Sequence, residues 1–298
     1  MENKKAIIYA GMAVLLWSTV ATAFKIALRN LQPFELMFYS SVFSTITLFI
    51  AVIIKQKFIN FKYLKIKDYL LFAFLGLLVP FGYYSILFKA YDLLPAQIAQ
   101  AINFTWPIAI VILSVIIKKE KLSILQFAAI FISFIGAYVV ISGGNFNNII
   151  NFNIQGIIYA FLSVFIWATY WLINKELNYD MSIALFFIFL FGSIYALITN
   201  VIFYPMAIPQ ITDLIPALYI GLFEMSITFF VWLTALKSAK STVIVNNIIY
   251  LTPFISLLII NFILKEIIKN STIIGLFLII SGIVLQLILK NKNLLTKS

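Results

Sequence analysis

Apolar blocks about 20 residues long recur along the chain, and short polar connections separate them. A helix needs roughly 20 apolar residues to cross the roughly 30 Å hydrocarbon core of a bilayer. The pattern therefore predicts an all-α integral membrane protein with ten transmembrane helices. We place them at residues 5–28, 34–54, 68–89, 95–117, 123–142, 154–175, 181–203, 213–236, 241–264 and 271–290.

The polar segment 143–153 divides these helices into two sets of five, and the two halves of the sequence repeat. Both halves contain spacings of 13 and 16 residues: Pro107, Glu120 and Gly136 in the first, and Pro253, Glu266 and Gly282 in the second. Matching spacings in the same order indicate a duplication. We predict one repeat at 1–145 and a second at 146–298.

Five helices per repeat turn the second repeat upside down relative to the first. Inverted repeats are the architecture of many secondary transporters. Sixteen of the 21 Lys and Arg residues lie in the termini and in the connections after the second, fourth, sixth and eighth helices, while four lie in the opposite connections. Because positive residues stay on the cytoplasmic side, we expect a multi-pass protein of the cell inner (cytoplasmic) membrane with both termini in the cytoplasm.

The composition, 63% hydrophobic and 10% charged, differs from that of soluble proteins, which carry about 25% charged residues. The net charge of +11 lies in the connections, so it does not predict a nucleic-acid partner. Without cysteine or histidine the chain has no thiol or imidazole chemistry, and we expect no cofactor and no metal site. The first block could be a signal peptide, but its length and the nine blocks after it favour a retained helix.

The predicted helices 95–117 and 241–264 each contain a proline, Pro107 and Pro253. Proline removes a backbone donor and disturbs the helix one turn before it. Interruptions at equivalent places in two inverted repeats point to the binding site of a transporter. Polar residues share a face with each proline: Gln97, Gln100 and Asn103 in the first helix, and Asn246, Asn247, Tyr250 and Asn261 in the second. Interhelical hydrogen bonds are the alternative use of such faces.

Two charged residues lie within apolar helices. Glu224 lies near the middle of 213–236, where an ionised carboxylate is costly and an intramembrane carboxylate is a functional-site candidate. Burial favours its neutral form, and a protonated Glu224 hydrogen-bonded to a neighbouring helix is the structural alternative. Lys25 lies near the end of 5–28, where it either reaches the interface or contacts a ligand.

Aromatic residues make up 17% of the chain, and a few are candidate cavity walls: Trp17, Tyr83, Tyr84, Trp106 and Trp171. Glu120 and Glu266 lie at helix junctions, where a structural role is expected. From these patterns we predict no catalytic residues, helix breaks at Pro107 and Pro253, and one set of substrate-binding residues. That set is Lys25, Tyr83, Gln100, Asn103, Trp106, Glu224, Asn246, Asn247 and Tyr250.

Three features together resemble the drug/metabolite transporter superfamily, in particular its EamA-type ten-helix exporters. They are LLWSTVATAFKIAL at 15–28, P-x12-E-x15-G in both halves, and ALKSAKSTVIVNNIIYLTP at 235–253. The usual signature has Gly after the Trp, where this chain has Ser18. The resemblance implies a basket of ten helices with a central cavity, and transport of amino acids, nucleoside-like metabolites or drugs, often outward and coupled to protons. The glutamate that related small multidrug transporters carry in their first helix is absent from this chain.

The leading hypothesis is a secondary transporter of small metabolites, such as amino acids or related amphipathic compounds, with Glu224 as the proton-coupling carboxylate or the partner of a substrate amine. Lys25 would then hold a substrate carboxylate. The alternatives are an uncoupled permease or channel with a structural Glu224, and an intramembrane lipid-modifying enzyme. The expected partners are a small-molecule substrate, protons and the lipid bilayer. A monomer is compatible with the sequence, which does not determine the oligomeric state.

Overall fold

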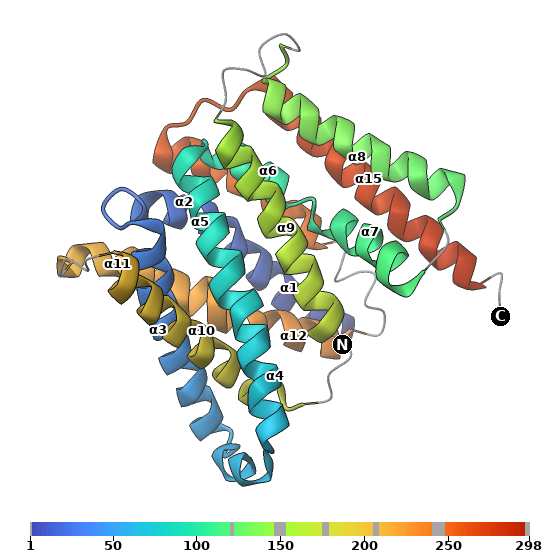
Figure 1. Ribbon diagram of the computed structural model, residues 1–298. Coiled ribbons are helices and arrows are strands. Elements are labelled where there is room, and N and C mark those ends of the chain that lie inside the picture. The colour runs from blue at the N-terminus through green and yellow to red at the C-terminus, as the bar shows by residue number, and fades with distance from the viewer. Residues whose placement is uncertain are drawn as a thin grey trace.

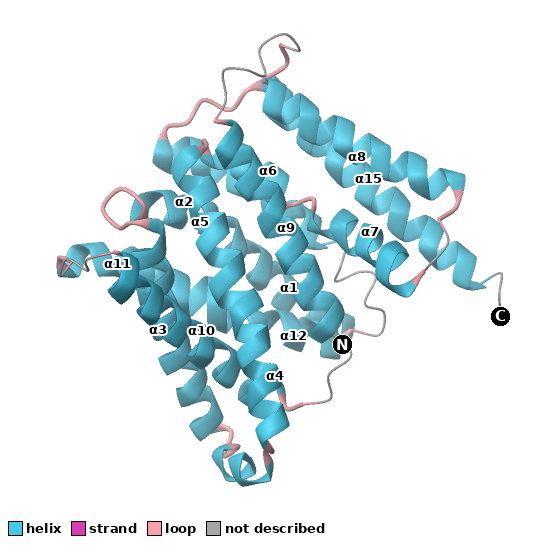
Figure 2. Cartoon of the chain, in the orientation of Figure 1, coloured by secondary structure: helices cyan, strands magenta, loops and turns pink. Residues whose placement is uncertain are grey.

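The computed structural model describes residues 2–119, 122–145, 153–174, 179–204, 209–239 and 248–295, and these residues form helices and connections without a strand (Figures 1 and 2). The helices, in chain order, are α1 (Glu2–Ser18), α2 (Val20–Ala27), α3 (Pro33–Ile54), η1 (Phe58–Tyr63), α4 (Ile66–Gly76), η2 (Leu77–Gly82), α5 (Tyr83–Leu93), α6 (Ala96–Asn103), α7 (Trp106–Lys118), α8 (Ile124–Ser142), α9 (Ile154–Asn174), α10 (Met181–Phe203), α11 (Ile211–Tyr219), η4 (Ile220–Ile227), α12 (Thr228–Ser238), η5 (Ile249–Leu251), α14 (Thr252–Ile259), η6 (Ile260–Leu264) and α15 (Asn270–Leu295).

Consecutive short helices join into membrane-spanning units. Within the described residues, nine units are long and apolar enough to cross a membrane, and they coincide with nine of the ten predicted helices. The tenth predicted helix, 241–264, is represented by the shorter apolar helix Ile249–Leu264, because 241–247 lie outside the described residues. The structure confirms the all-α transmembrane fold class. The largest differences are the spans Ile66–Leu93 and Ile211–Ser238, which extend beyond the predicted 68–89 and 213–236.

Two spans are interrupted just before their prolines. Phe104 and Thr105 separate α6 from α7, and the short 3-10 segment η5 precedes α14. In both cases the proline stands near the start of the second helix, Pro107 in α7 and Pro253 in α14. A proline is tolerated there because the first N–H groups of a helix have no intrahelical partner. The predicted helix breaks are therefore present.

Two further interruptions were not indicated by the sequence pattern. Pro80 lies in η2, a π-helical segment between α4 and α5, and η4 is a π-helical segment between α11 and α12. Gly76 and Gly221, which the repeat pairs, each lie directly before or within the distorted segment. π-helical turns within helices are frequent at functional sites. Both repeats thus distort the same helix, the third of each set of five.

The helix pairs follow the duplication. α3 packs on α10 and α8 packs on α15, so the second and fifth helices of each repeat contact their own counterparts. α1 packs on α12 and α14, and α9 packs on α5 and α7. The first helix of each repeat therefore contacts the third and fourth helices of the other repeat. Contacts that persist when the halves are exchanged are those expected of two repeats related by a twofold axis.

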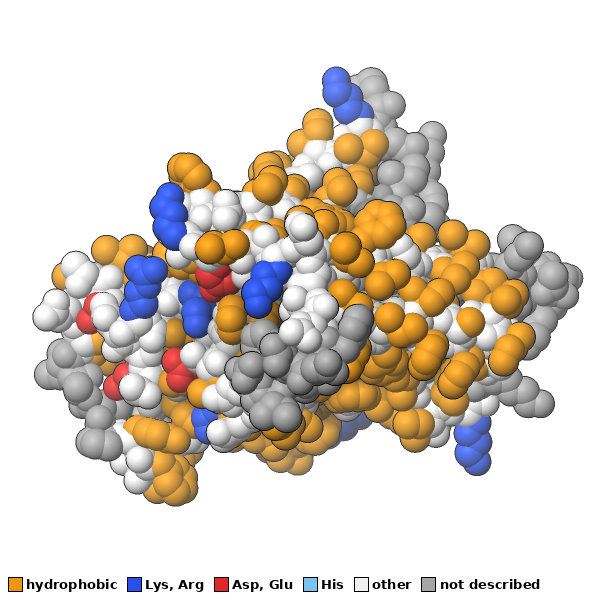
Figure 3. All heavy atoms as spheres, turned by 90° about the horizontal axis from the view of Figure 1, so that it is seen from above, with side chains coloured by type: hydrophobic (Ala, Val, Ile, Leu, Met, Phe, Trp, Pro, Cys, Tyr) orange, Lys and Arg blue, Asp and Glu red, His pale blue; other side chains and the backbone are white. Residues whose placement is uncertain are grey.

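The α8–α15 pair forms one flank of the molecule (Figure 1). A Cβ added at Gly136 would lie 2.5 Å from the Gly275 carbonyl oxygen, and one added at Gly275 would lie 2.5 Å from the Gly136 oxygen. Small residues permit such close approach of membrane helices. The outer side of the pair is apolar, with Phe127, Phe131 and Phe277 exposed. In Figure 3 apolar side chains cover this side, whereas charged groups gather at the other side.

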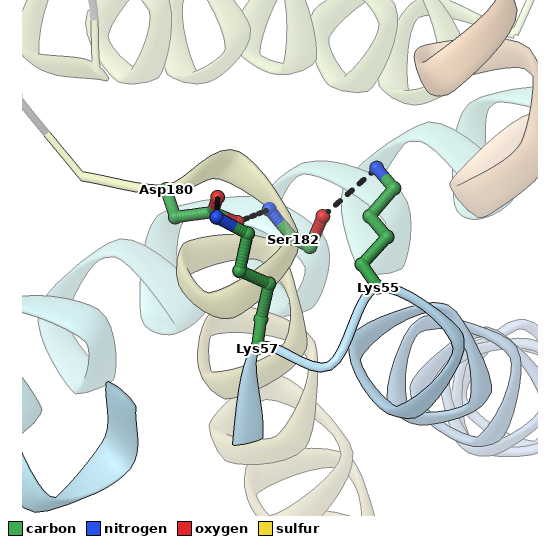
Figure 4. A network of polar contacts seen from close by, with 4 residues as sticks. All are labelled: Lys55, Lys57, Asp180 and Ser182. Atoms are coloured by element: carbon green, nitrogen blue, oxygen red, sulfur yellow. Dashed lines mark hydrogen bonds and ion pairs between the residues drawn. The ribbon is translucent and has the colours of Figure 1, made fainter. Parts of the chain in front are cut away.

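Polar contacts tie the start of α10 to the connection that follows α3 (Figure 4). Lys57 Nζ lies 3.4 Å from Asp180 Oδ2, and Lys55 Nζ donates to Ser182 Oγ over 3.1 Å. Asp180 also caps α10 by accepting from the Ser182 N–H at 3.0 Å. The predicted topology assigns this end of the bundle to the side of the two chain termini, which we call the terminal side.

Candidate functional site

A cavity of about 430 Å³ lies between the two sets of helices. Its volume falls within the range of small-molecule sites, roughly 300–1,000 Å³. Its described lining comes from both halves of the chain: Trp17, Val20, Ala21, Phe24, Tyr83, Leu87, Tyr91, Gln100, Asn103, Phe104, Trp106, Pro107, Ile110, Val111, Trp167, Trp171, Met181, Glu224, Phe229, Trp232, Leu236, Ile249, Tyr250, Thr252 and Leu287.

All five tryptophans of the chain line this cavity. They form part of a continuous aromatic wall. The Trp17 ring centroid lies 6.1 Å from that of Phe229 and 5.7 Å from that of Trp232. On the other side Trp167 lies 4.6 Å from Tyr83. Rigid aromatic side chains give the cavity a defined shape at a small cost in conformational entropy.

Glu224 lies within η4, with roughly 20 Å of helix between it and each end of the span Ile211–Ser238. Its Oε1 accepts a hydrogen bond of 3.0 Å from the hydroxyl of Tyr84, a side chain with no exposed surface. The indole of Trp17 is a second hydrogen-bond partner of the carboxylate. Glu224 is half-buried and lines the cavity. It therefore combines a deep position with a surface that a ligand can reach.

The backbone around Glu224 is fixed by hydroxyl groups. The π-helical turn leaves carbonyls without their usual donors, and Ser226 Oγ donates to the Gly221 oxygen over 2.8 Å. Thr228 Oγ1 donates to the Phe223 oxygen in the same way. From α3, Ser44 Oγ lies 2.8 Å from Ser226 Oγ and donates to the Met225 oxygen over 3.1 Å. These contacts set the direction in which Glu224 points.

The polar residues expected in the fourth span separate into two groups. Gln100 and Asn103 line the cavity together with Pro107, and the Tyr83 hydroxyl donates to Asn103 Oδ1 over 3.3 Å. Gln97 instead forms interhelical hydrogen bonds, to the Ile267 carbonyl over 3.0 Å and from the Thr272 hydroxyl over 2.8 Å. The cavity reading therefore fits the inner half of this face, and the packing reading fits Gln97.

In the ninth predicted helix Tyr250 lines the cavity, whereas Pro253 is not among its lining residues. Asn261 faces away and donates to the Glu266 carbonyl over 2.8 Å. Asn246 and Asn247 lie outside the described residues, as does Glu120. Tyr83 and Trp106, the two aromatic residues expected at the site, both belong to the wall.

Lys25 does not line the cavity. Its Nζ donates to the carbonyl oxygens of Tyr91, at 2.7 Å, and of Leu94, at 3.2 Å, at the end of α5. The last carbonyls of a helix lack intrahelical donors, and a cation there also interacts favourably with the helix dipole. The geometry places the Lys25 ammonium on the fold itself and away from the substrate carboxylate that the sequence suggested.

Glu266 holds the same corner of the bundle from the other repeat. Its carboxylate accepts from the Ala96 N–H at 2.9 Å and from the Gln97 N–H at 3.4 Å, so it caps the start of α6. Lys25 and Glu266 thus fix the α5–α6 junction. The cavity extends the other way, since Met181 and Leu236 line it near helix ends on the terminal side.

Several wall residues were missed by the sequence pattern: Trp167, Phe229, Trp232 and Thr252. Trp232 could have been found, because it lies eight residues after Glu224 and so shares its helical face. Phe229 could not, because the π-helical turn changes the angle between successive side chains. Glu224 is the one charged residue among the described lining residues. Within the described chain no group of three metal-ligating residues occurs.

Comparisons with known proteins agree with this architecture. The model of the "EamA-like transporter family" matches residues 4–142 and again residues 154–288. An "Uncharacterized transporter" of Archaeoglobus fulgidus is 24% identical over 293 residues, which cover 95% of this chain and 97% of the relative. A solved structure described as "Crystal structure of protein" superposes with a TM-score of 0.68 and 19% identity, covering 97% of this chain and 98% of that chain.

The solved structure shows a shared fold, and the archaeal relative is a named transporter of nearly the same length. The family model matches in two consecutive copies that together span most of the sequence. The resemblance to EamA-type exporters is confirmed by these matches. The chain is a multi-pass integral membrane protein that belongs to the EamA-like transporter family.

Proposed function

We propose that this chain is a secondary active transporter that exports small amphipathic metabolites by alternating access, with proton coupling through Glu224. The observation that carries the proposal is the position of Glu224: a lone carboxylate in the lining of an aromatic cavity between two transporter repeats. An intramembrane carboxylate is costly unless its charge is used or neutralised. A protonatable group at the substrate cavity satisfies that condition in two ways, with a proton or with a substrate amine.

Coupling follows from the number of charges. One carboxylate neutralises one positive charge, so a proton and a bound ammonium exclude each other at Glu224. Such competition exchanges a substrate cation for a proton across the membrane. The cavity extends toward the terminal side while Lys25 and Glu266 fix the junction at the other end. We therefore assign this conformation to the inward-facing state, with the termini in the cytoplasm.

The test uses purified protein in liposomes that contain a pH-sensitive dye. A panel of amines, amino acids and nucleosides is applied to the wild type, to Glu224→Gln and to the control Asp213→Asn. Asp213 lies outside the cavity, where Asn30 donates to it over 2.8 Å. Substrate-dependent proton flux in the wild type and the control, lost in Glu224→Gln, is the expected result. Substrate movement without proton flux in any protein would contradict coupling.

The second candidate is an uncoupled permease in which Glu224 is structural. The Tyr84–Glu224 hydrogen bond favours it, because a protonated Glu224 can pack between helices as a polar contact. In that case Glu224→Gln, which keeps an acceptor for Tyr84, moves substrate as fast as the wild type. Equal flux in both proteins would select this candidate.

The remaining parts of the proposal concern partners and location. Membership in a transporter family supports transport without covalent chemistry, and we propose no enzymatic activity, no nucleic-acid partner and a monomeric unit in the cell membrane. The chain has no cysteine, so single cysteines at Lys62 and Asn30 report topology directly. In intact cells an impermeant thiol reagent should label the Asn30→Cys protein and spare Lys62→Cys. The reverse pattern would place the termini outside.

A further inference from the structure

We infer that the cavity selects organic monocations, amines with an aromatic or aliphatic body, over zwitterionic amino acids. The inference rests on the proposed function for the role of the cavity and specifies the charge of its substrate. It begins from the lining, in which Glu224 is the one formally charged member among the described residues. The ligand that balances this charge carries a single positive charge.

The walls favour the same ligand. Eleven of the described lining residues are aromatic. An aromatic face attracts a cation within about 6 Å of its centroid, and most strongly when water is excluded. Trp17 both contacts the Glu224 carboxylate and belongs to this wall, with Phe229 and Trp232 beside it. An ammonium at Glu224 therefore meets a carboxylate and aromatic faces together.

A substrate carboxylate finds no comparable partner. Lys25, the nearest candidate from the sequence, gives two hydrogen bonds to the carbonyls of Tyr91 and Leu94 and lies outside the lining. The helix break beside Asn103 does not supply free backbone donors in quantity. The N–H groups of Phe104, Thr105 and Ile108 donate to carbonyls 2.9 Å away. The neutral donors that remain, such as the Gln100 amide, can hold a hydroxyl or carbonyl group without a charge.

Charge separation within the ligand completes the argument. In an α-amino acid the carboxylate is attached to the carbon that bears the ammonium. Binding the ammonium at Glu224 would bring that carboxylate beside the Glu224 oxygens. Like charges at this separation repel strongly in a medium of low dielectric constant. An amino-acid amide or ester, and an amine without the carboxylate, keep the attraction and avoid the repulsion.

Tryptophan fluorescence provides the readout, because all five tryptophans line the cavity. The purified protein is titrated with four ligands that share a phenyl body: phenethylamine, phenylalaninamide, phenylalanine and 2-phenylethanol. Phenylalanine and its amide differ in the carboxylate charge alone, and phenethylamine and 2-phenylethanol differ in the ammonium. We expect apparent Kd values for both amines that are at least about tenfold lower than those for the zwitterion and the alcohol.

Two variants locate the charge effect. Glu224→Gln should reduce the preference of the amines over 2-phenylethanol to less than about twofold. Asp213→Asn, the carboxylate outside the cavity, should preserve it. The comparison of ligands on the wild type stands by itself if Glu224→Gln does not fold.

Phenylalanine binding as tightly as phenylalaninamide would overturn the inference, whatever the transport assay gives. So would the absence of any fluorescence change with both amines up to their solubility limits. A preference for amines that survives Glu224→Gln would also overturn it. Selective amine binding without proton-coupled flux would contradict the coupling in the proposed function and leave the charge selectivity standing.

Discussion

The hydroxyl of Tyr84 donates a hydrogen bond of 3.0 Å to Glu224, across 140 residues of sequence and between the two repeats. Tyr84 follows the π-helical segment η2, and Glu224 lies within the equivalent segment η4. The two distorted helices, the third of each repeat, thus meet at the one charged group of the described cavity lining. Their junction is the place where a change at Glu224 can be transmitted to both repeats.

Replacing Tyr84 by Phe should separate orientation from charge at this junction. The ring and its packing against Tyr83 and Phe88 remain, while the donor to the carboxylate is lost. A hydrogen bond to a charged group contributes roughly 1.5–3 kcal/mol, so we expect substrate-dependent flux to fall about tenfold with the protein still folded. Liposome flux and a melting curve measure the two effects.

Tyr91→Phe is the matched control for that experiment. Tyr91 is also a buried aromatic residue of the cavity wall, and its hydroxyl has no hydrogen-bond partner among the described residues. Its removal should change flux by less than about twofold. Equal losses in the two variants would mean that Tyr84 acts through packing alone.

Lys25→Met should affect stability and leave ligand binding intact. The Tyr91 and Leu94 carbonyls lose a charged donor, which costs about 1 kcal/mol in a membrane protein. A lowered Tm with an unchanged Kd for phenylalaninamide is expected, and the exposed Lys237→Met serves as the control. Loss of binding at an unchanged Tm would return Lys25 to the substrate site.

Glu266→Ala should destabilise the start of α6. Its carboxylate accepts from the N–H groups of Ala96 and Gln97, and removal of an N-terminal cap costs about 1 kcal/mol. Glu266→Gln keeps an acceptor oxygen and should recover part of the loss. Thermal unfolding in one detergent compares the three proteins. A wild-type Tm in Glu266→Ala would show that other contacts hold the junction.

Gly136→Ala should separate α8 from α15. The new Cβ would meet the Gly275 carbonyl oxygen at 2.5 Å, a backbone atom that can move only with its helix. Overpacking of this kind costs about 1–3 kcal/mol. Gly11→Ala is the control, since nothing lies within 4 Å of a Cβ there, and it should match or exceed wild-type stability. The Tm of each variant decides the comparison.

The membrane spans and their order were accessible from the sequence because lipid imposes one rule on every segment. A chain in hydrocarbon must satisfy its own backbone, so a long apolar block is a helix wherever it packs. The intervals that begin at Pro107 and Pro253 likewise exposed the repeat. Pro80 and the π-helical turn around Glu224 were missed, because hydroxyl bonds such as Ser226 to Gly221 stabilise them. Those bonds depend on neighbouring helices.

At the site, the sequence alone determined that Glu224 lies deep in an apolar helix and that Gln100 and Asn103 share a helical face. These statements depend on rise and periodicity, which are properties of one helix. Only the tertiary structure decided that Tyr84 reaches Glu224, that all five tryptophans surround one cavity, and that Lys25 turns to the carbonyls of α5. A side chain's partner is set by which helices pack together, and the pattern within a single helix does not contain that information.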